Sequence, residues 1–398
     1  MMRVANSTYY QQAVSSIDQN QTQLSKVQAQ MSSGLRIQTA SDDPVAAGQV
    51  LGVNQSIADV ANWQSNAASL QSWLGQEDSS LTSVNTSLQQ IQTLALQANN
   101  ATLNSGDRQA IATEMQQQLN SILQQANTQD SSGNYIFGGT QSGGAPFSQT
   151  SSGASYSGNS NVNMLSLGPT SEIAAGDPGD AVFMQLKSGD GNINVGAASG
   201  NTGTASLTAA GVTDSSQYAG GSYTVKFTAG QYQVLDSGNN VVGSGTYTDG
   251  SAIQFKGVSL TLTGTPADGD SFSVAPSTAQ SLFSGVQNLI NLVANPGSSG
   301  AQRAQNQTAM YGALQSLSGA QSHITNVLAG VGAREQAVTT ATSQLQSRST
   351  QLQTTLTGLQ DLDYAAATAQ FSQTQLTLQA AEQSYVQIQG LSLFNYIK

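Results

Sequence analysis

The chain of 398 residues contains no cysteine and a single histidine, His323. Disulfides, thiolate metal ligands and cysteine nucleophiles are therefore excluded, and a zinc hydrolase site or a Ser/His triad would depend on one residue. His323 lies beside a position of an apolar helical stripe, with no second ligand nearby in sequence, so we interpret it as an ordinary helix residue. We expect no catalytic residues, no metal and no cofactor, and hence a protein that is not an enzyme.

Charged residues are also scarce, at 8% of the chain, and the net charge is −11. The 11 basic residues are scattered singly, whereas a nucleic-acid surface requires clustered Lys and Arg, so no nucleic-acid partner is expected. No run of about 18 apolar residues occurs, which argues against membrane insertion. The N-terminal MMRVANSTYYQQAVSSIDQ lacks the apolar core of a secretory signal. If the chain leaves the cell, we expect another export route.

The two ends of the chain carry short heptad patterns, in which apolar residues recur at steps of three and four. The first pattern has Gln21 and Gln28 in its remaining slots and stops at Gly34; its apolar members are Tyr10, Val14, Ile17, Leu24, Met31 and Leu35. The last pattern consists of Phe371, Thr374, Leu378, Ala381, Tyr385 and Ile388. Each segment is too short to be a stable helix alone and exposes an apolar stripe. Each therefore needs a partner, and copies of the same chain are the simplest one.

Two much longer apolar stripes lie inward of these terminal segments. The first, within residues 44–99, would form a helix about 84 Å long at 1.5 Å per residue. The second runs through residues 310–359 with every step three or four. Glu77 and Glu335 interrupt the two stripes. We interpret polar residues at such positions as setting helix register and partner number rather than performing chemistry.

The composition changes in the middle of the chain, from about Ser131 to Pro276, where Gly, Ser, Thr and Asp are abundant. Apolar and polar residues alternate over 222–235, 252–262 and 270–276, and turn sequences such as Ser-Gly-Asn-Asn separate the runs. Alternation of this kind predicts half-buried strands. We therefore expect a compact antiparallel β domain.

The order of these segments predicts a mostly α protein with an inserted β domain. The fold would consist of a long, antiparallel, coiled-coil-like helical rod bundle, an antiparallel β domain and terminal heptad helices. The expected segments are an N-terminal assembly helix and connector at 1–43, the N-terminal half of the rod at 44–132, the β domain at 133–277, the C-terminal half of the rod at 278–362 and a C-terminal assembly helix at 363–398.

The stretch MSSGLRIQTASDDPVAA, residues 31–47, joins the first two helical segments. Asp43 before Pro44 is a typical N-cap followed by proline at the first helical position, a reading that we favour over a catalytic pair formed with Asp42. Gly34 suits the end of the preceding helix. Arg36 either reaches one of the acids within its own chain or bridges to a neighbouring subunit.

The same stretch, extended to MSSGLRIQTASDDPVAAGQ, resembles the N-terminal signature of the flagellin family. The resemblance continues through SLQQIQTLALQANN (87–100) and GDRQAIATEMQQQLNSI (106–122), and the segment from about 305 to 398 is similar to the C-terminal half of the family pattern. NYIFGGTQSGGAPF (134–147) and QLTLQAAEQSYVQIQGLSLFNYIK (375–398) resemble the members that join the flagellar hook to the filament more than they resemble the filament subunit.

The resemblance implies a structural subunit of the bacterial flagellum, exported through the flagellar channel and located outside the cell at the hook-filament junction. Its implied partners are copies of itself, an adjacent hook-associated protein, filament flagellin, the export apparatus and an export chaperone. Two alternatives are a filament flagellin and, from another class, a secreted adhesin or enzyme with its activity in the β domain. The expected assembly interface comprises Val14, Ile17, Leu24, Met31, Leu35, Arg36, Asp42, Asp43, Phe371, Leu378, Tyr385, Ile388, Leu393, Phe394 and Tyr396.

Overall fold

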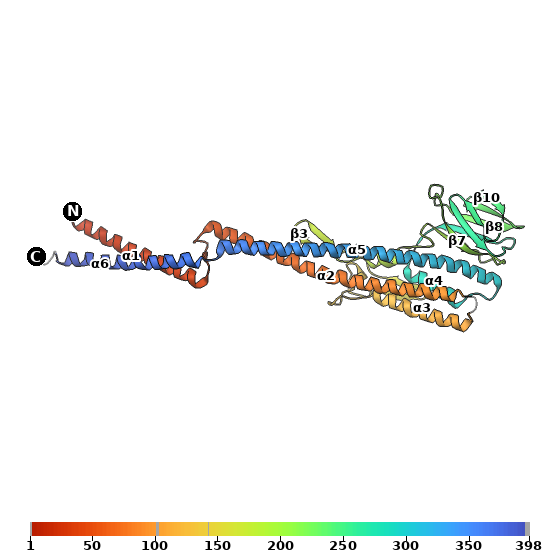
Figure 1. Cartoon of the computed structure of the whole chain (residues 1–398), viewed down its shortest axis with the longest axis horizontal. Coiled ribbons are helices and arrows are strands. Elements are labelled where there is room, and N and C mark those ends of the chain that lie inside the picture. The colour runs from red at the N-terminus through yellow and green to blue at the C-terminus, as the bar shows by residue number, and fades with distance from the viewer. Residues whose placement is uncertain (1, 101–102, 142, 395–398) are drawn as a thin grey trace. The chain divides into compact units, whose positions relative to one another are not determined.

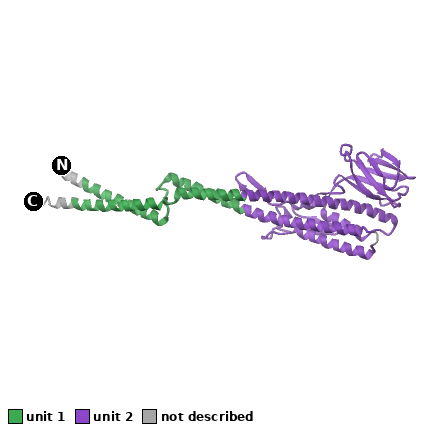
Figure 2. Cartoon of the chain, in the orientation of Figure 1, with its two compact units in different colours: residues 1–65, 342–398 green, residues 66–341 purple. Residues whose placement is uncertain are grey.

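The computed structural model describes residues 2–100, 103–141 and 143–394, and it describes only the backbone of 2–7 and 388–394. The chain divides into two compact units, one made of residues 1–65 with 342–398 and the other of residues 66–341 (Figure 2). Two long helices, α2 (Pro44–Ala98) and α5 (Gly300–Gln360), contribute residues to both units (Figure 1).

The first unit contains the two terminal helices, α1 (Met2–Ser33) and α6 (Tyr364–Phe394), packed side by side and antiparallel (Figure 1). Near one end of the pair the rings of Tyr10 and Tyr385 meet edge to face, with centroids 5.4 Å apart. Near the other end the hydroxyl of Tyr364 donates a hydrogen bond to the carbonyl of Met31 at 3.2 Å. The two terminal heptad segments are therefore partners of each other within one chain.

The face of α1 that packs on α6 differs from the predicted apolar stripe at every second of its positions. At each of these, the shielded residue is the one just before the predicted residue. Asn20 and Val27 are shielded where the sequence pattern placed Gln21 and Gln28, and Val27 is only 1% exposed. Val14 is 42% exposed, while Ala13 beside it is half-buried. The predicted register was wrong at these positions. The predicted and the observed face share every seventh residue, and they differ only in the order of the steps between those residues: four then three in the prediction, three then four in the structure. Burying Val27 also leaves the amide of Gln28 in water.

The long helices α2 and α5 run antiparallel, as the sequence predicted. In the first unit the guanidinium of Arg348 lies 5.8 Å from the ring centroid of Trp63. In the second unit the side-chain amide of Gln321 donates to that of Gln92 at 3.3 Å. The stripe of α2 is shielded almost completely within the second unit: Leu70, Leu74, Leu81, Val84, Leu88, Ile91, Ala95 and Ala98 have no exposed surface.

Two further helices complete the helical core of the second unit, α3 (Ser105–Ala126) and α4 (Leu282–Ala294), which lie side by side (Figure 1). A reciprocal capping box between Asn104 and Asp107 starts α3. A cluster of aromatic rings fills the core where the helices meet the strands: Phe137, Phe147, Phe183 and Phe283.

The β domain of the second unit has a core of its own and two antiparallel sheets. The five-stranded sheet has the order β10-β9-β8-β13-β6 and the three-stranded sheet the order β11-β12-β7. Their bounds are β6 (Ile193–Ala197), β7 (Ser206–Val212), β8 (Tyr223–Thr228), β9 (Gln231–Asp236), β10 (Val241–Thr246), β11 (Ala252–Phe255), β12 (Val258–Thr263) and β13 (Ser271–Pro276). The runs at 222–235, 252–262 and 270–276 thus form the predicted strands.

Small two-stranded sheets and short turns of helix connect the helical core to the β domain. The paired strands are β1 with β2, β3 with β4 and β5 with β14. Their bounds are β1 (Phe147–Thr150), β2 (Gly153–Tyr156), β3 (Met164–Gly168), β4 (Ser171–Ala174), β5 (Leu186–Lys187) and β14 (Ala279–Gln280), with helical turns η1 (Ile136–Gly138) and η2 (Asp180–Met184). The predicted class, a mostly α protein with an inserted antiparallel β domain, is confirmed.

The observed register of α1 predicts which of two valines stabilises the helix pair. Val27→Ala removes buried hydrocarbon at the α6 contact, and we expect it to lower the free energy of unfolding of the first unit by roughly 1.5 kcal/mol, at ~0.8 kcal/mol per CH2 group. Val14→Ala is the matched control, and its effect should stay within ~0.5 kcal/mol because Val14 is 42% exposed, against 1% for Val27. Denaturant unfolding followed by circular dichroism compares them. Equal effects, or a larger one for Val14, would contradict the observed register.

Candidate assembly surface

Four helix ends meet in the first unit at two short connectors, residues 34–43 between α1 and α2 and residues 361–363 between α5 and α6. We call this meeting point the joint. Gly34 has φ +75°, a conformation that favours glycine, and its N–H bonds the carbonyl of Gln30 at 2.9 Å, which ends α1. Leu35 and Asp361 form an isolated antiparallel bridge, and the N–H of Leu362 donates to the carbonyl of Gly34 at 2.9 Å.

Arg36 ties the joint together from the side of the first connector. Its Nη2 donates to the carbonyl of Leu359 at 2.7 Å, and its backbone N–H donates to the carbonyl of Gln360 at 2.7 Å. Both carbonyls belong to the last turn of α5, where backbone acceptors lack helical partners and a cation is favourable. Its Nη1 lies 3.4 Å from Oδ2 of Asp43. Of the two roles left open for Arg36, the structure shows the contact within one chain.

The adjacent acids Asp42 and Asp43 serve as structural anchors. Asp43 accepts the N–H of Ala46 at 3.0 Å and so caps α2, as predicted. Asp42 accepts the N–H of Thr39 at 2.9 Å and pairs with Nζ of Lys26 on α1 at 2.9 Å. The Lys26 ammonium and the backbone donors of Thr39 and Gln38 hold the pKa of Asp42 well below its usual 3.8. The two acids therefore contact backbone N–H groups and basic side chains of their own chain, which is a structural role.

The other connector ends in an equivalent cap that the sequence reasoning missed. Asp363 precedes α6 and accepts the N–H groups of Ala365 at 2.9 Å and Ala366 at 3.1 Å. The available signal was an Asp four residues beyond the last position of the α5 stripe. Lys26 and Tyr364 also hold the joint, and no sequence pattern identifies them. Lys26 pairs with Asp42 across the connector, and Tyr364 bonds a backbone carbonyl of α1.

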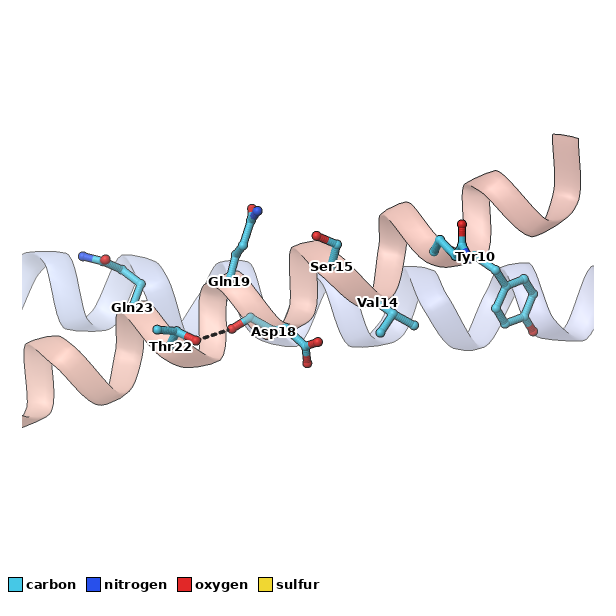
Figure 3. Close-up of a pocket in the computed structure, with 8 residues that line it drawn as sticks. Tyr10, Val14, Ser15, Asp18, Gln19, Thr22 and Gln23 are labelled. Atoms are coloured by element: carbon cyan, nitrogen blue, oxygen red, sulfur yellow. Dashed lines mark hydrogen bonds between the residues drawn. The ribbon is translucent and has the colours of Figure 1, made fainter.

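An open groove follows one side of α1 (Figure 3). Its volume is about 750 Å3, and its lining comes from α1 alone: Tyr10, Gln11, Val14, Ser15, Asp18, Gln19, Thr22 and Gln23. Thr22 donates its hydroxyl to the backbone carbonyl of Asp18 at 2.8 Å. The carboxylate of Asp18 forms no salt bridge with residues 8–100, 103–141 and 143–387, whose side chains are described. The groove thus presents mixed apolar and neutral polar groups with one acid.

The predicted interface residues fall into three groups. Ile17, Leu24, Met31, Phe371, Leu378 and Tyr385 lie half-buried on the facing sides of α1 and α6, whereas Val14 lines the open groove. Leu35, Arg36, Asp42 and Asp43 belong to the joint rather than to a helix face. The side chains of Ile388, Leu393 and Phe394, and all of Tyr396, lie outside the described residues.

Further exposed apolar side chains gather on the same unit, and the sequence reasoning did not single them out. They are Tyr9 on α1, Val45 and Leu51 on the first turns of α2, and Tyr364, Leu376 and Val386 on α6. Singly exposed apolar residues are ordinary, but this unit holds most of the large ones in the described chain. A surface of this kind is suited to contacts between subunits.

In the described part of the chain, no three or more Asp, Glu or His side chains are grouped so that they could hold a metal ion. None of the described helices is both long enough and apolar enough to cross a membrane.

The anchor at Asp42 predicts a sensitivity of the joint to acid. Because its pKa is lower in the folded chain than in the unfolded one, Asp42 stabilises the first unit at neutral pH, and this contribution is lost as the pH falls below about 4. Asp42→Asn should therefore lower the thermal midpoint at pH 6, with a difference from the wild type that shrinks toward pH 3. Lys26→Met removes the ion pair with Asp42, so it should remove much of the same pH-dependent stability. A gap between wild type and Asp42→Asn that is constant over this range would refute the anchor.

Comparison with known families accounts for both ends of the chain and part of the β domain. The model of the bacterial flagellin N-terminal helical region matches residues 4–142, and that of the bacterial flagellin C-terminal helical region matches residues 314–397. Residues 197–276 match the D2-like domain of flagellar hook-associated protein 1. The helices and the β domain thus resemble two kinds of flagellar protein.

Individual relatives agree with these models. Flagellar hook-associated protein 3 of Escherichia coli K12 is 32% identical over 187 residues, 47% of this chain and 58% of that protein. The chain thus matches less than two thirds of the length of its first curated relatives.

Two solved structures are matched over nearly their full length. The crystal structure of Xanthomonas campestris FlgL is 32% identical, with a TM-score of 0.73 over 77% of this chain and 99% of that one. Hook-associated protein 3 of Legionella pneumophila is 31% identical, with a TM-score of 0.74 over 77% and 98%. With flagellin models at both ends and structural relatives above 30% identity, the chain belongs to the flagellin family, in its hook-associated protein 3 branch.

Proposed function

We propose that the chain is a non-enzymatic structural subunit of the bacterial flagellum that joins the hook to the filament. The observation that carries this proposal is the match with hook-associated protein 3 in sequence and over nearly the whole of two solved structures. A filament flagellin is less well supported, because the curated relatives with the broadest match are hook-associated proteins. The match of residues 197–276 to a hook-associated domain further favours an axial protein over an adhesin or enzyme.

Copies of the chain would associate through the first unit. Each α1–α6 pair half-buries its inner seam within one chain. The contacts left for a neighbour are then the open groove along α1 and the exposed apolar residues of α2 and α6. In this proposal the groove accepts a helix of a second copy, which would cover Val14 and the exposed ring of Tyr9. The remaining predicted interface residues, Ile388, Leu393, Phe394 and Tyr396, would extend this contact toward the C-terminus.

The proposed location is the extracellular flagellum, reached through the flagellar export channel. The partners would be copies of the chain, the adjacent hook-associated protein and the first filament flagellins, with the export apparatus and an export chaperone acting before assembly. These assignments rest on family membership, and they agree with the absence of cysteine.

Deleting the gene distinguishes a junction subunit from a filament flagellin. A strain without the junction subunit should retain hooks, carry no filaments and release flagellin monomers into the medium, and the wild-type gene should restore filaments. Electron microscopy of the cells and immunoblots of the medium provide the measurement. Filaments on the hooks of the deletion strain would rule out the junction role, and hooks with no flagellin in the medium would point instead to a filament subunit.

Removing residues 372–398 tests whether the terminal helices serve assembly. The truncated chain should keep the second unit folded, because its core lies within residues 66–341, while α1 loses most of its partner and part of its helicity. Circular dichroism and sedimentation should report a soluble monomer that fails to restore filaments to the deletion strain. Loss of the entire cooperative fold, or normal filaments, would show that these residues are not mainly an intersubunit surface.

A further inference from the structure

Glu77 is an ionisable side chain with no exposed surface, in the helical core of the second unit. It stands on α2 within the apolar stripe that faces α5, where an uncompensated charge is costly. Its Oε1 accepts the backbone N–H of Asp177 at 3.0 Å, and its Oε2 lies 3.9 Å from Nη2 of Arg334 on α5. Arg334 in turn donates to the carboxylate of Asp177. We call Glu77, Asp177 and Arg334 the buried trio after its buried member Glu77, since the side chains of Arg334 and Asp177 are 18% and 31% exposed.

The charges of the buried trio balance only when one acid is protonated. Arg334 offsets a single carboxylate, so ionising both Glu77 and Asp177 leaves a net negative charge beside apolar side chains. Burial, followed by the negative charge of Asp177, raises the pKa of Glu77 from 4.5 to about 8, although Arg334 opposes the shift. Asp78 and Glu335 are the adjacent acids on α2 and α5, and neither forms an ion pair with the trio among the described side chains. At neutral pH the trio is therefore mostly neutral overall.

Asp177 belongs to the segment 160–185, which we call the strap because it is bonded to both long helices. The side-chain amide of Asn66 on α2 donates to the carbonyl of Ser166 at 2.8 Å, and Nε2 of His323 on α5 lies 3.0 Å from the carbonyl of Ala181. The strap leads directly into β5, which pairs with β14 where the chain enters and leaves the β domain. The docking of the strap therefore helps to hold the start of the β domain.

The strap also lies close to α2 at Gly176, next to Asp177. A Cβ atom at Gly176 would lie 2.8 Å from Nε1 of Trp73 and 3.3 Å from Oε2 of Glu77, so the strap backbone lies directly against both side chains. Within the described chain neither of these two buried atoms has a hydrogen-bond partner. Both oxygens of the Glu77 carboxyl thus lie against the strap: Oε1 is bonded to Asp177, and Oε2 lies beside Gly176. A change in the charge of this carboxyl therefore acts directly on the strap.

We propose that the Glu77 carboxyl is a latch that docks the strap on α2 and α5 when it is protonated and releases the strap at Asp177 when it is ionised. With both carboxylates charged, Arg334 satisfies only one of them, and the repulsion is relieved at least cost by moving Asp177, which is on a connecting segment, rather than a residue within a long helix. The latch loosens the strap at Asp177 and Gly176 as the pH rises, while Val182 and Phe183 stay in the core. This inference concerns the second unit alone and does not depend on the proposed flagellar role.

Trp73 provides a built-in reporter of the latch, since the chain has only one other tryptophan, Trp63. In a Trp63→Phe background, quenching of Trp73 fluorescence by acrylamide should increase between pH 6 and 9.5 with a midpoint near 8. Adding Glu77→Gln, which keeps the shape but cannot ionise, should abolish the transition. The thermal midpoint of the second unit should fall as the pH rises from 4.5 toward 8, because the folded state binds the proton more tightly, and Glu77→Gln should flatten this slope.

Asp177→Asn supplies an independent test with a predicted direction. Without the negative charge at position 177, Arg334 offsets the ionised Glu77 and no repulsion remains, so the rise in fluorescence quenching should be lost or strongly reduced, while circular dichroism checks that helicity is retained. If Glu77→Gln fails to fold, the loss of the transition in Asp177→Asn decides the question. The latch is refuted by a transition that survives Glu77→Gln, by a full transition in Asp177→Asn, or by quenching of the wild-type Trp73 that does not change over the pH range.

Discussion

The antiparallel packing of α2 against α5 is the constraint on which the rest of the structure depends. Each helix carries an apolar stripe far longer than one domain core requires, and a single helix has no means to bury it. Pairing brings segments from opposite halves of the sequence together, as the contacts of Gln92 with Gln321 and of Trp63 with Arg348 record. The β domain then becomes an insertion between two halves of one helical pair, and α1 and α6 become neighbours.

The joint connects the paired long helices to the paired terminal helices. Arg36 places a positive charge at the last carbonyls of α5, while Asp43 and Asp363 cap the helices that start there. Backbone groups left open by four helix ends are thus satisfied inside one chain. The α1–α6 pair also half-buries its inner seam within one chain. The outer surface of the first unit is what remains for neighbouring copies.

The long elements were predictable because their periodicity extends over many turns. The helix predicted at 44–99 is observed at Pro44–Ala98, and the alternating runs form strands β8, β9, β11, β12 and β13. The register of α1 was not predictable, since two patterns share every seventh residue and only the contact with α6 selects Val27. At the joint, the sequence predicted the cap at Asp43, the helix end at Gly34 and, as one of two alternatives, a contact of Arg36 with one of the acids. It did not predict the bond of Arg36 to α5, because that carbonyl lies 323 positions away. For Glu77, the sequence showed an interrupted stripe but not its partners Asp177 and Arg334.

The central claim is that the outer face of α1 becomes a contact between copies in the assembled flagellum. The absence of cysteine makes a single engineered thiol an unambiguous probe of it. Ser15→Cys places the thiol in the open groove, and Ser237→Cys places it on the exposed β9–β10 turn as a control. Maleimide labelling of both variants should be rapid in the monomer, and in isolated hook-filament structures the label at position 15 should be lost while that at 237 persists. Equal labelling at position 15 in both states would contradict the account.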